Sequence, residues 1–264
     1  MNHLDRLESQ SIYFLREAFN KIERFGMLWS MGKDSTVMLW LARKAFFGHL
    51  PFPLLHIATG DDFPEVEALG QRLTGDWGLD LVRGDCPPLD DIDPALPPAA
   101  RAAARKTAGL KSLIAAQGFT GVAVGIRRDE DSSRAKERVF STRGEDGEWR
   151  CRDQPPEFWD QFNTDFPPGA HVRIHPLLAW TELDVWRYIA REAIPVVELY
   201  FAEGGERYRS LGDRAHCRPV ESRAATVAEI IAELEVTTVA ERAGRAADLE
   251  AEGMFERLRV DGHA

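Results

Sequence analysis

A short polar loop between two apolar runs constrains this chain more than any other feature. Met27 to Ser30 is an apolar stretch, a Gly-Lys-Asp-Ser loop follows it, and a run with helical spacing of apolar residues continues to Phe47. This pattern predicts a strand, a tight turn and a helix over Ser35 to Phe47. Such a turn directs backbone N–H groups and a helix N-terminus at one point, so the sequence predicts an anion-binding site there.

The side chains of this loop suit a phosphate ligand. Lys33 adds a positive charge, Ser30 and Ser35 add hydroxyl donors, and Asp34 offers a carboxylate to a metal ion. The spacing differs from GxxxxGK[ST], which excludes the P-loop of ATPases and GTPases. The loop resembles instead the PP-loop of the ATP pyrophosphatase superfamily, whose enzymes cleave ATP between the α and β phosphates; the ordinary alternative is a turn rich in small residues.

Strands and helices are predicted to alternate through the first three quarters of the chain. Short apolar runs predict strands over 27–30, 54–59, 80–83, 120–125 and 172–178, and helical periodicity covers 4–24, 35–47, 63–77 and 99–117. Residues 141–170, rich in Gly, Pro, Asp and Trp, are predicted to be irregular, and Thr181 with Asp184 predicts a capping box at the start of a further helix. This alternation predicts an α/β fold with a parallel sheet and helices on both faces. We expect one ATP-binding α/β domain over residues 1–195 and a helical or irregular C-terminal appendage over residues 196–264.

A cluster of cationic side chains follows the strand predicted to end at Gly125. Its members are Arg127, Arg128, Arg134, Lys136 and Arg138, interleaved with acidic residues. Ligands of open parallel sheets bind outside the carboxyl ends of the strands, which is where this cluster must lie. Guanidinium groups hold phosphate and sulfate through paired N–H donors, so the cluster favours a polyanion or a tetrahedral oxyanion. The alternative is a solvated face of salt bridges, with three of the arginines on one side of a helix.

Composition narrows the function classes. The net charge of −10 argues against broad nonspecific binding of nucleic acid. No apolar stretch approaches the roughly 18 residues of a membrane span, and the polar N-terminus lacks a signal-peptide pattern, so we expect a cytoplasmic protein with no membrane partner. Three widely spaced cysteines support neither a disulfide framework nor a CxxC metal site.

Several motifs together resemble one family, the ATP-cleaving small subunits of heterodimeric bacterial sulfate adenylyltransferases. These motifs are Ser-Met-Gly-Lys-Asp-Ser at 30–35, Arg-Arg-Asp-Glu at 127–130, Ser-Arg-Ala-Lys-Glu-Arg at 133–138, Trp-Thr-Glu-Leu-Asp-Val-Trp at 180–186 and Glu-Arg at 241–242. The resemblance runs along nearly the whole chain. It implies that ATP and sulfate are joined into adenosine 5′-phosphosulfate and pyrophosphate, with a separate GTPase large subunit as partner.

The resemblance also assigns roles to residues. It implies catalytic roles for Lys33, Arg127, Arg128 and Arg134. It implies nucleotide-binding roles for Ser30, Gly32, Lys33, Asp34, Ser35, Thr59, Lys136 and Arg138, and a Mg²⁺ ion bound by Asp34.

The chain departs from the family pattern at several points. Ala58 stands where an aspartate is expected, an insertion between Ala202 and Arg207 is almost absent, and the chain ends in Gly-His-Ala. These departures favour a specialised member and leave two alternatives open. One is an ATP pyrophosphatase of a sulfur-insertion system such as DNA phosphorothioation, which alone would involve nucleic acid. The other is a catalytically silent nucleotide-binding paralogue. His56, inside an apolar strand, is expected to be a core residue rather than a general base.

Overall fold

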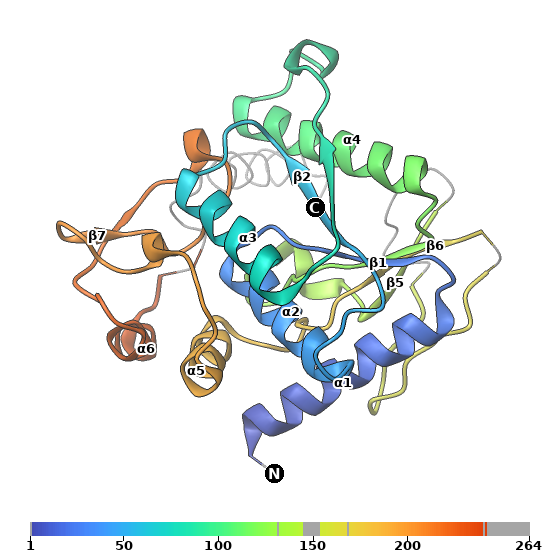
Figure 1. The fold of residues 1–264 in the computed structure, drawn as a ribbon, viewed down its shortest axis with the longest axis horizontal. Helices are drawn as coiled ribbons and strands as arrows, with labels where there is room; N and C mark the ends of the chain where they lie inside the picture. Colours follow the sequence, from blue (N-terminus) through green and yellow to red (C-terminus); the bar gives the residue numbers. More distant parts are fainter. Residues whose placement is uncertain (1, 131, 145–153, 168, 240, 242–264) are drawn as a thin grey trace, which may run out of the picture.

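A parallel sheet with one antiparallel edge forms the centre of the molecule. The computed structural model describes residues 2–130, 132–144, 154–167, 169–239 and 241 (Figure 1). Within these residues the main sheet has the strand order β3-β2-β1-β4-β6-β5. Its strands are β1 (Phe25–Leu28), β2 (Leu54–Ala58), β3 (Leu81–Asp85), β4 (Gly121–Ala123), β5 (Phe140–Arg143) and β6 (His171–Ile174). All neighbouring pairs are parallel except β5 with β6.

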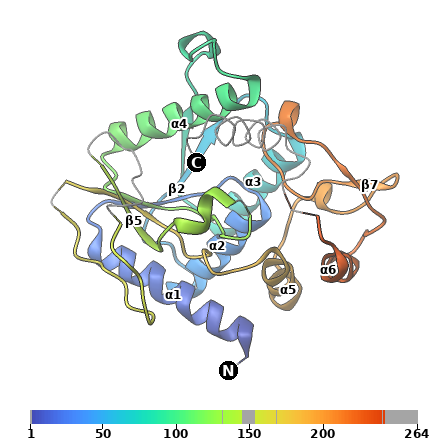
Figure 2. The same cartoon turned by 180° about the vertical axis from the view of Figure 1, so that it is seen from behind.

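Helices cover both faces of this sheet, as the alternating pattern predicts. They are α1 (His3–Lys21), α2 (Lys33–Ala45), α3 (Pro64–Trp77) and α4 (Pro98–Gln117). Leu113 of α4 packs on one face with Leu55 and Val122, whereas the apolar residues of α1, α2 and α3 belong to the larger core on the other face. Figures 1 and 2 show α4 on the opposite side of the sheet from α1 and α2. The predicted α/β fold is therefore confirmed.

Two local features differ from the sequence prediction. The strand β5 opens a stretch, residues 141–170, that was predicted to be irregular throughout. Residues Ser132–Lys136 form a 3₁₀ turn, so the cationic segment is not an α-helix with three arginines on one side. A 3₁₀ turn has about three residues per turn, and it therefore directs Arg134 and Arg138 differently from an α-helix.

The chain after β6 continues the same core. It contains α5 (Glu182–Glu192), the short strands β7 (Glu206–Arg207) and β8 (Val220–Glu221), α6 (Val227–Val236), and 3₁₀ turns at Glu198–Tyr200 and Arg214–His216. A further 3₁₀ turn, Leu89–Asp91, lies between β3 and α4. Figures 1 and 2 show α5 and α6 side by side. Buried Tyr200 and Ile230 join the core that also contains α1 and α2. The division into two domains at residue 195 stays a prediction.

The capping box predicted at the start of α5 is confirmed. The hydroxyl of Thr181 accepts a hydrogen bond from the backbone N–H of Asp184, and the Asp184 carboxylate accepts one from the N–H of Thr181. These reciprocal bonds fix the first turn of α5 beside the cationic segment. None of the helices among the described residues has the length and apolar character needed to cross a bilayer.

Candidate active site

The loop between β1 and α2 is held in a defined shape by contacts on both sides. Met31 has a φ of 63°, in the left-handed region that residues other than glycine rarely adopt. Its side chain is buried against Gly70 of α3, where an added Cβ would lie 2.2 Å from the Met31 sulfur. On the other side, a Cβ on Gly125 would lie 3.3 Å from the Ser35 backbone. Two small residues thus let α3 and the end of β4 approach the loop closely.

Polar contacts within the loop leave the N-terminus of α2 directed at the site. The hydroxyls of Ser30 and Ser35 lie 3.1 Å apart, and Ser35 Oγ donates to the Gly32 carbonyl at 3.1 Å. Gly32 is the N-cap of α2 and supplies no side-chain cap. The backbone N–H of Lys33 donates to the hydroxyl of Tyr200 at 2.9 Å. The first turn of α2 therefore retains N–H groups for an anion.

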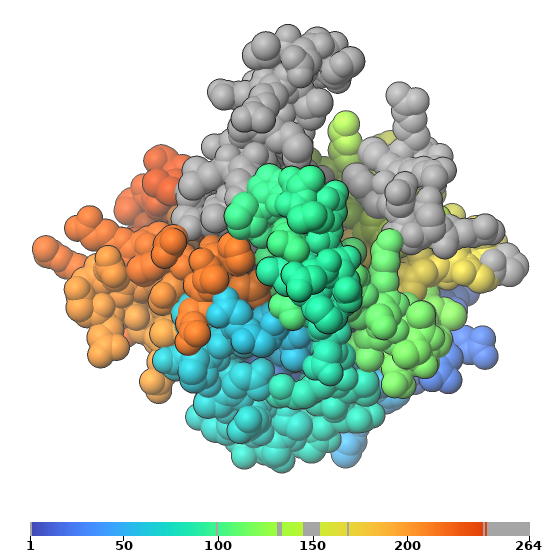
Figure 3. All heavy atoms as spheres, turned by 90° about the horizontal axis from the view of Figure 1, so that it is seen from above, coloured from blue at the N-terminus to red at the C-terminus, as the bar shows by residue number. Residues whose placement is uncertain are grey.

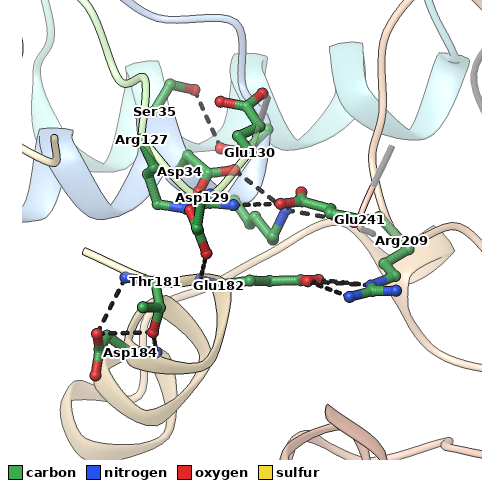
Figure 4. A network of polar contacts seen from close by, with 12 residues as sticks. Asp34, Ser35, Arg127, Asp129, Glu130, Thr181, Glu182, Asp184, Arg209 and Glu241 are labelled. Atoms are coloured by element: carbon green, nitrogen blue, oxygen red, sulfur yellow. Dashed lines mark hydrogen bonds and ion pairs between the residues drawn. The ribbon is translucent and has the colours of Figure 1, made fainter. Parts of the chain in front are cut away.

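Three charged side chains are buried together under this loop. We call Lys33, Arg127 and Glu241 the buried group. Lys33 and Arg127 each contact the Glu241 carboxylate, and the three side chains are at most 3% exposed (Figure 4). Asp34 contacts both cations, with its Oδ2 3.2 Å from Lys33 Nζ. Two cations and two carboxylates thus neutralise one another where water cannot screen them.

The pKa values of the buried group follow from its pairing. Burial by itself would raise the pKa of Glu241, but the charges of Lys33 and Arg127 and their hydrogen bonds outweigh burial and hold it well below its usual range. Burial would likewise lower the pKa of Arg127, yet the carboxylates around it, first Glu241 and then Asp129, raise the pKa above its ordinary value. Glu241 and Arg127 are therefore both charged at neutral pH.

Asp129 joins the buried group to the start of α5. Its Oδ1 accepts from Arg127 Nε at 2.9 Å, and its Oδ2 accepts from the backbone N–H of Glu182 at 2.7 Å. The Glu182 carboxylate in turn pairs with Arg209, whose terminal nitrogen lies 2.7 Å away (Figure 4). A continuous chain of ion pairs and one backbone hydrogen bond thus connects the end of β4, α5 and the C-terminal segment.

A cavity of about 380 Å³ opens beside the loop. Four residues of the loop line it: Ser30, Gly32, Asp34 and Ser35. Cationic side chains from three other elements also line it, namely Lys106 of α4, Arg134 of the 3₁₀ turn and Arg173 of β6. The volume falls within the range of small-molecule sites, and its lining combines the β1–α2 loop, hydroxyl groups and positive charge. Such a cavity suits a ligand with several anionic groups.

The surface around the cavity comes from segments far apart in the sequence. The backbone N–H groups of Arg214 and Ala215 donate to Asp61 at 2.9 and 2.8 Å, and Asp213 pairs with Lys106 at 2.8 Å. Figure 3 shows this late segment, in orange, lying against the earlier part of the chain, in blue-green. The C-terminal region therefore forms one wall of the site.

The structure brings together only some of the residues that the sequence singled out. The loop residues and Arg134 line the cavity, whereas Lys33 and Arg127 lie in the buried group. The side chains of Arg128 and Arg138 donate to the carbonyls of Glu137 and Pro155, and neither of them lines the cavity.

Two further candidates also lie outside the cavity lining. Lys136 is exposed, and Thr59 is buried with its hydroxyl donating to Asp62 at 3.2 Å. The proposed roles of these residues stay predictions.

Four residues of the site escaped the sequence analysis as site residues. These are Glu241, Tyr200, Lys106 and Arg173. Arg173 is mostly buried, and burial lowers its pKa to about 10, with help from the neighbouring charge of Arg143. Arg173 interrupts the apolar pattern of a predicted strand, and a charged residue at such a position could have indicated a site residue. Glu241 was part of a recognised Glu-Arg motif, but no pattern placed it beside Lys33.

Comparisons with known proteins show what the chain resembles. Residues 24–219 match the family model described as the phosphoadenosine phosphosulfate reductase domain. Sulfate adenylyltransferase subunit 2 of Rhizobium johnstonii is 40% identical, over 99% of this chain and 93% of that protein. The protein of the same name from Trichlorobacter lovleyi is 39% identical, over 100% of this chain and 98% of its own length.

Solved structures resemble this chain in fold. The phosphoadenylyl-sulfate reductase of Candida auris, in a phosphate complex, has a TM-score of 0.56 at 17% identity, covering 82% of this chain and 96% of that one. Candida glabrata FMN adenylyltransferase, in complex with FAD and inorganic pyrophosphate, has a TM-score of 0.56 at 18% identity. The match covers 81% of this chain and 63% of that one. At these identities the likeness concerns the fold alone.

Proposed function

Because this chain belongs to the phosphoadenosine phosphosulfate reductase domain family, and within it to the sulfate adenylyltransferase subunit 2 proteins, we propose that it is the ATP-cleaving subunit of a sulfate adenylyltransferase. It joins ATP and sulfate into adenosine 5′-phosphosulfate and releases pyrophosphate. The structural observation that carries this proposal is the cavity, which has the β1–α2 loop on one side and the side chains of Arg134 and Arg173 in its lining.

The loop side of the cavity suits the departing pyrophosphate. The N-terminus of α2 supplies backbone N–H groups, and Ser30 and Ser35 supply hydroxyls. Lys33 follows directly at the first turn, where its charge stabilises phosphate oxygens. We therefore assign the β and γ phosphates of ATP to this loop.

Another part of the lining suits the acceptor. Arg134 and Arg173 line the cavity from two elements, and guanidinium groups bind tetrahedral oxyanions through paired N–H donors. A sulfate oxygen attacks the α phosphorus in line with the leaving group, so a new P–O bond forms as the bond between the α phosphorus and the bridging oxygen breaks. The electron pair of the broken bond leaves with pyrophosphate.

Positioning and charge stabilisation then account for the catalysis. Sulfate is already an anion at neutral pH, so no side chain has to remove a proton from it. This agrees with the place of His56, whose Nδ1 is bonded to the Trp29 carbonyl at 3.0 Å and which is only 4% exposed.

Mg²⁺ is proposed as the accompanying ion, with Asp34 as its protein ligand. Asp34 lines the cavity at the loop, and its oxygens are hard ligands of the kind Mg²⁺ prefers together with substrate phosphates. The ion would neutralise phosphate charge. Lys33 and Arg127 balance the Asp34 carboxylate in the structure.

A larger partner subunit follows from the relatives, which carry the name subunit 2. We propose that this partner is a GTPase that drives the uphill synthesis of adenosine 5′-phosphosulfate, and that the complex works in the cytoplasm. These assignments rest on the family resemblance.

The reverse reaction tests the catalytic assignment without the partner. Adenosine 5′-phosphosulfate, pyrophosphate and Mg²⁺ should yield ATP and sulfate, because this direction runs downhill and needs no GTP. Lys33→Ala should slow ATP formation by about 10²–10³-fold. Lys21→Ala, which removes an exposed lysine at the end of α1, should leave it unchanged. The forward reaction with the GTPase should release pyrophosphate only when sulfate is present.

Two outcomes would contradict the proposal. ATP cleavage that ignores sulfate would indicate a different acceptor, as in a sulfur-insertion enzyme. Nucleotide binding without turnover in either direction, with the partner present, would indicate a silent paralogue.

A further inference from the structure

A second cluster of ligand-type side chains lies where β2 gives way to α3. His56 is in β2, Asp62 is in the connection and Glu67 is in the first turns of α3, elements that Figure 1 shows close together. One ligand atom from each of the three residues lies within 4.8 Å of the other two. His56 and Asp62 also line the cavity, so the cluster borders the candidate active site.

The protonation of His56 is set by the backbone. Its Nδ1 lies 3.0 Å from the carbonyl oxygen of Trp29, which can only accept a hydrogen bond, so Nδ1 carries the proton. In the neutral imidazole, Nε2 then has a lone pair and no hydrogen. Histidines that bind metals are commonly oriented in this way, with the second ring nitrogen donating to a carbonyl or carboxylate.

The lone pair of His56 Nε2 faces acceptors rather than donors. Nε2 is buried without a hydrogen-bond partner, and its nearest charged neighbour is Glu67 Oε1 at 3.6 Å. An imidazole lone pair and two carboxylates therefore converge with no proton between them. Either a second proton on the imidazole or a bound cation has to balance this arrangement.

Neighbouring groups hold the two carboxylates in place. Asp62 Oδ2 accepts from the backbone N–H and the hydroxyl of Thr59, both at 3.2 Å. Glu67 pairs with Arg83, whose nitrogens lie 2.9 and 3.3 Å from its two oxygens. Each carboxylate retains lone pairs beyond these bonds, and the Arg83 side chain is 40% exposed, so it can turn toward solvent.

We propose that His56, Asp62 and Glu67 form a binding site for a divalent transition-metal ion, distinct from the Mg²⁺ that accompanies ATP. Bond lengths of about 2.1 Å to nitrogen and oxygen in a tetrahedral site place ligand atoms about 3.4 Å apart, close to the 3.6 Å between His56 and Glu67. One imidazole and two carboxylates suit Zn²⁺, Mn²⁺, Fe²⁺ or Co²⁺ better than Mg²⁺. Three protein ligands leave coordination positions for water.

The test uses Co²⁺ as a spectroscopic probe on the full chain after removal of metals by chelation. Without nucleotide present, a Mg²⁺–ATP complex cannot contribute. Titration with Co²⁺ should give a visible ligand-field absorption band that reaches its maximum at one equivalent of Co²⁺. Addition of Zn²⁺ should displace the Co²⁺ and remove the band. Glu67→Gln and Asp62→Asn should each weaken Co²⁺ binding by at least about tenfold, as expected when a metal site loses a ligand or its close support.

Glu65→Gln is the matched control, because Glu65 is an exposed residue of the same helix and the substitution removes the same charge. It should bind Co²⁺ like the unchanged chain. Equal binding by Glu67→Gln and Glu65→Gln, or no Co²⁺ band in the unchanged chain, would overturn the proposal in favour of a doubly protonated His56 paired with Glu67. Neither result depends on adenylyl transfer, so failure here leaves the proposed function standing.

Discussion

One set of ion pairs lies under the β1–α2 loop and another lines the cavity, and the two sets differ in their access to water. The buried group consists of Lys33, Arg127 and Glu241, with side chains 1%, 0% and 3% exposed. The second set, which we call the open pair, consists of Glu130 and Arg134, with side chains 14% and 24% exposed. Except for Glu241, the members of both sets come from segments that the sequence marks as anion-binding, yet they have different surroundings in the structure.

This difference shows two ways in which cationic side chains near the cavity are stabilised by carboxylates. A buried cation needs a carboxylate beside it, because removal from water is expensive, and Glu241 supplies that carboxylate. The oxygens of a nucleotide phosphate must then compete with Glu241 for Lys33 and Arg127. The open pair is screened by water, so Arg134 can change partner at little expense.

The largest expected effect is on stability, at Glu241. Glu241→Gln removes the carboxylate between two buried cations and should lower the free energy of unfolding by about 3–5 kcal/mol, as when one partner of a buried ion pair is lost. Glu130→Gln makes the same change in the open pair and should lower it by less than about 1 kcal/mol. Denaturant unfolding of both variants measures the contrast. Equal, small losses would show that burial does not separate the two sets.

The next effect is on catalysis, at Lys33. Lys33→Ala should reduce kcat by about 10²–10³-fold, the usual loss when one group that stabilises developing negative charge is removed. The reverse reaction with adenosine 5′-phosphosulfate and pyrophosphate measures it. Because Glu241 also loses a partner, circular dichroism should confirm that the variant is folded. A variant that kept more than half of the activity would remove Lys33 from the pyrophosphate site.

The dependence of stability on pH should distinguish the buried group from a buried histidine, His175. Burial lowers the pKa of His175 to about 4 from the ordinary 6.5, and it lowers that of His171 similarly. A histidine with a depressed pKa stabilises the fold fully above 6.5, and this contribution is lost as pH falls toward 4 because the unfolded chain binds the proton first. We expect a loss of up to about 3 kcal/mol from His175 in this window.

Glu241 responds at lower pH. Its pKa lies below the ordinary 4.5, so its contribution is present above pH 4.5 and is lost only as pH falls below that value. Unfolding measured across both windows should therefore show two successive losses. His175→Gln should reduce the first loss to the part that comes from His171, and it should leave the second unchanged. A single acid transition unaffected by His175→Gln would contradict this assignment.

Local sequence signals predicted the elements well and the site only in part. The turn before α2 and the capping box at Thr181 depend on neighbouring residues, so their patterns were visible in the sequence. The pairing of Lys33 with Glu241 spans 208 positions, and the bond of Lys33 to Tyr200 spans 167. No periodicity encodes such contacts.

The cationic segment shows the same limit. Composition identified its charge, but the 3₁₀ turn at Ser132–Lys136 decides which side chain faces the cavity. Arg134 lines the cavity, whereas Arg138 donates to the carbonyl of Pro155, a residue of the stretch that the sequence left without regular structure.

The smallest expected effect tests the open pair itself. Arg134→Ala should raise the KM for sulfate and lower kcat/KM by about tenfold, which corresponds to about 1.4 kcal/mol, with a stability change within about 1 kcal/mol. Arg134→Lys should recover only part of the loss, because a lysine keeps the charge but lacks the paired donors that fit a tetrahedral oxyanion. Kinetics with sulfate and ATP varied separately make the distinction: an effect confined to the KM for ATP would move Arg134 to the nucleotide side, and the open pair would then serve the same ligand as the buried group.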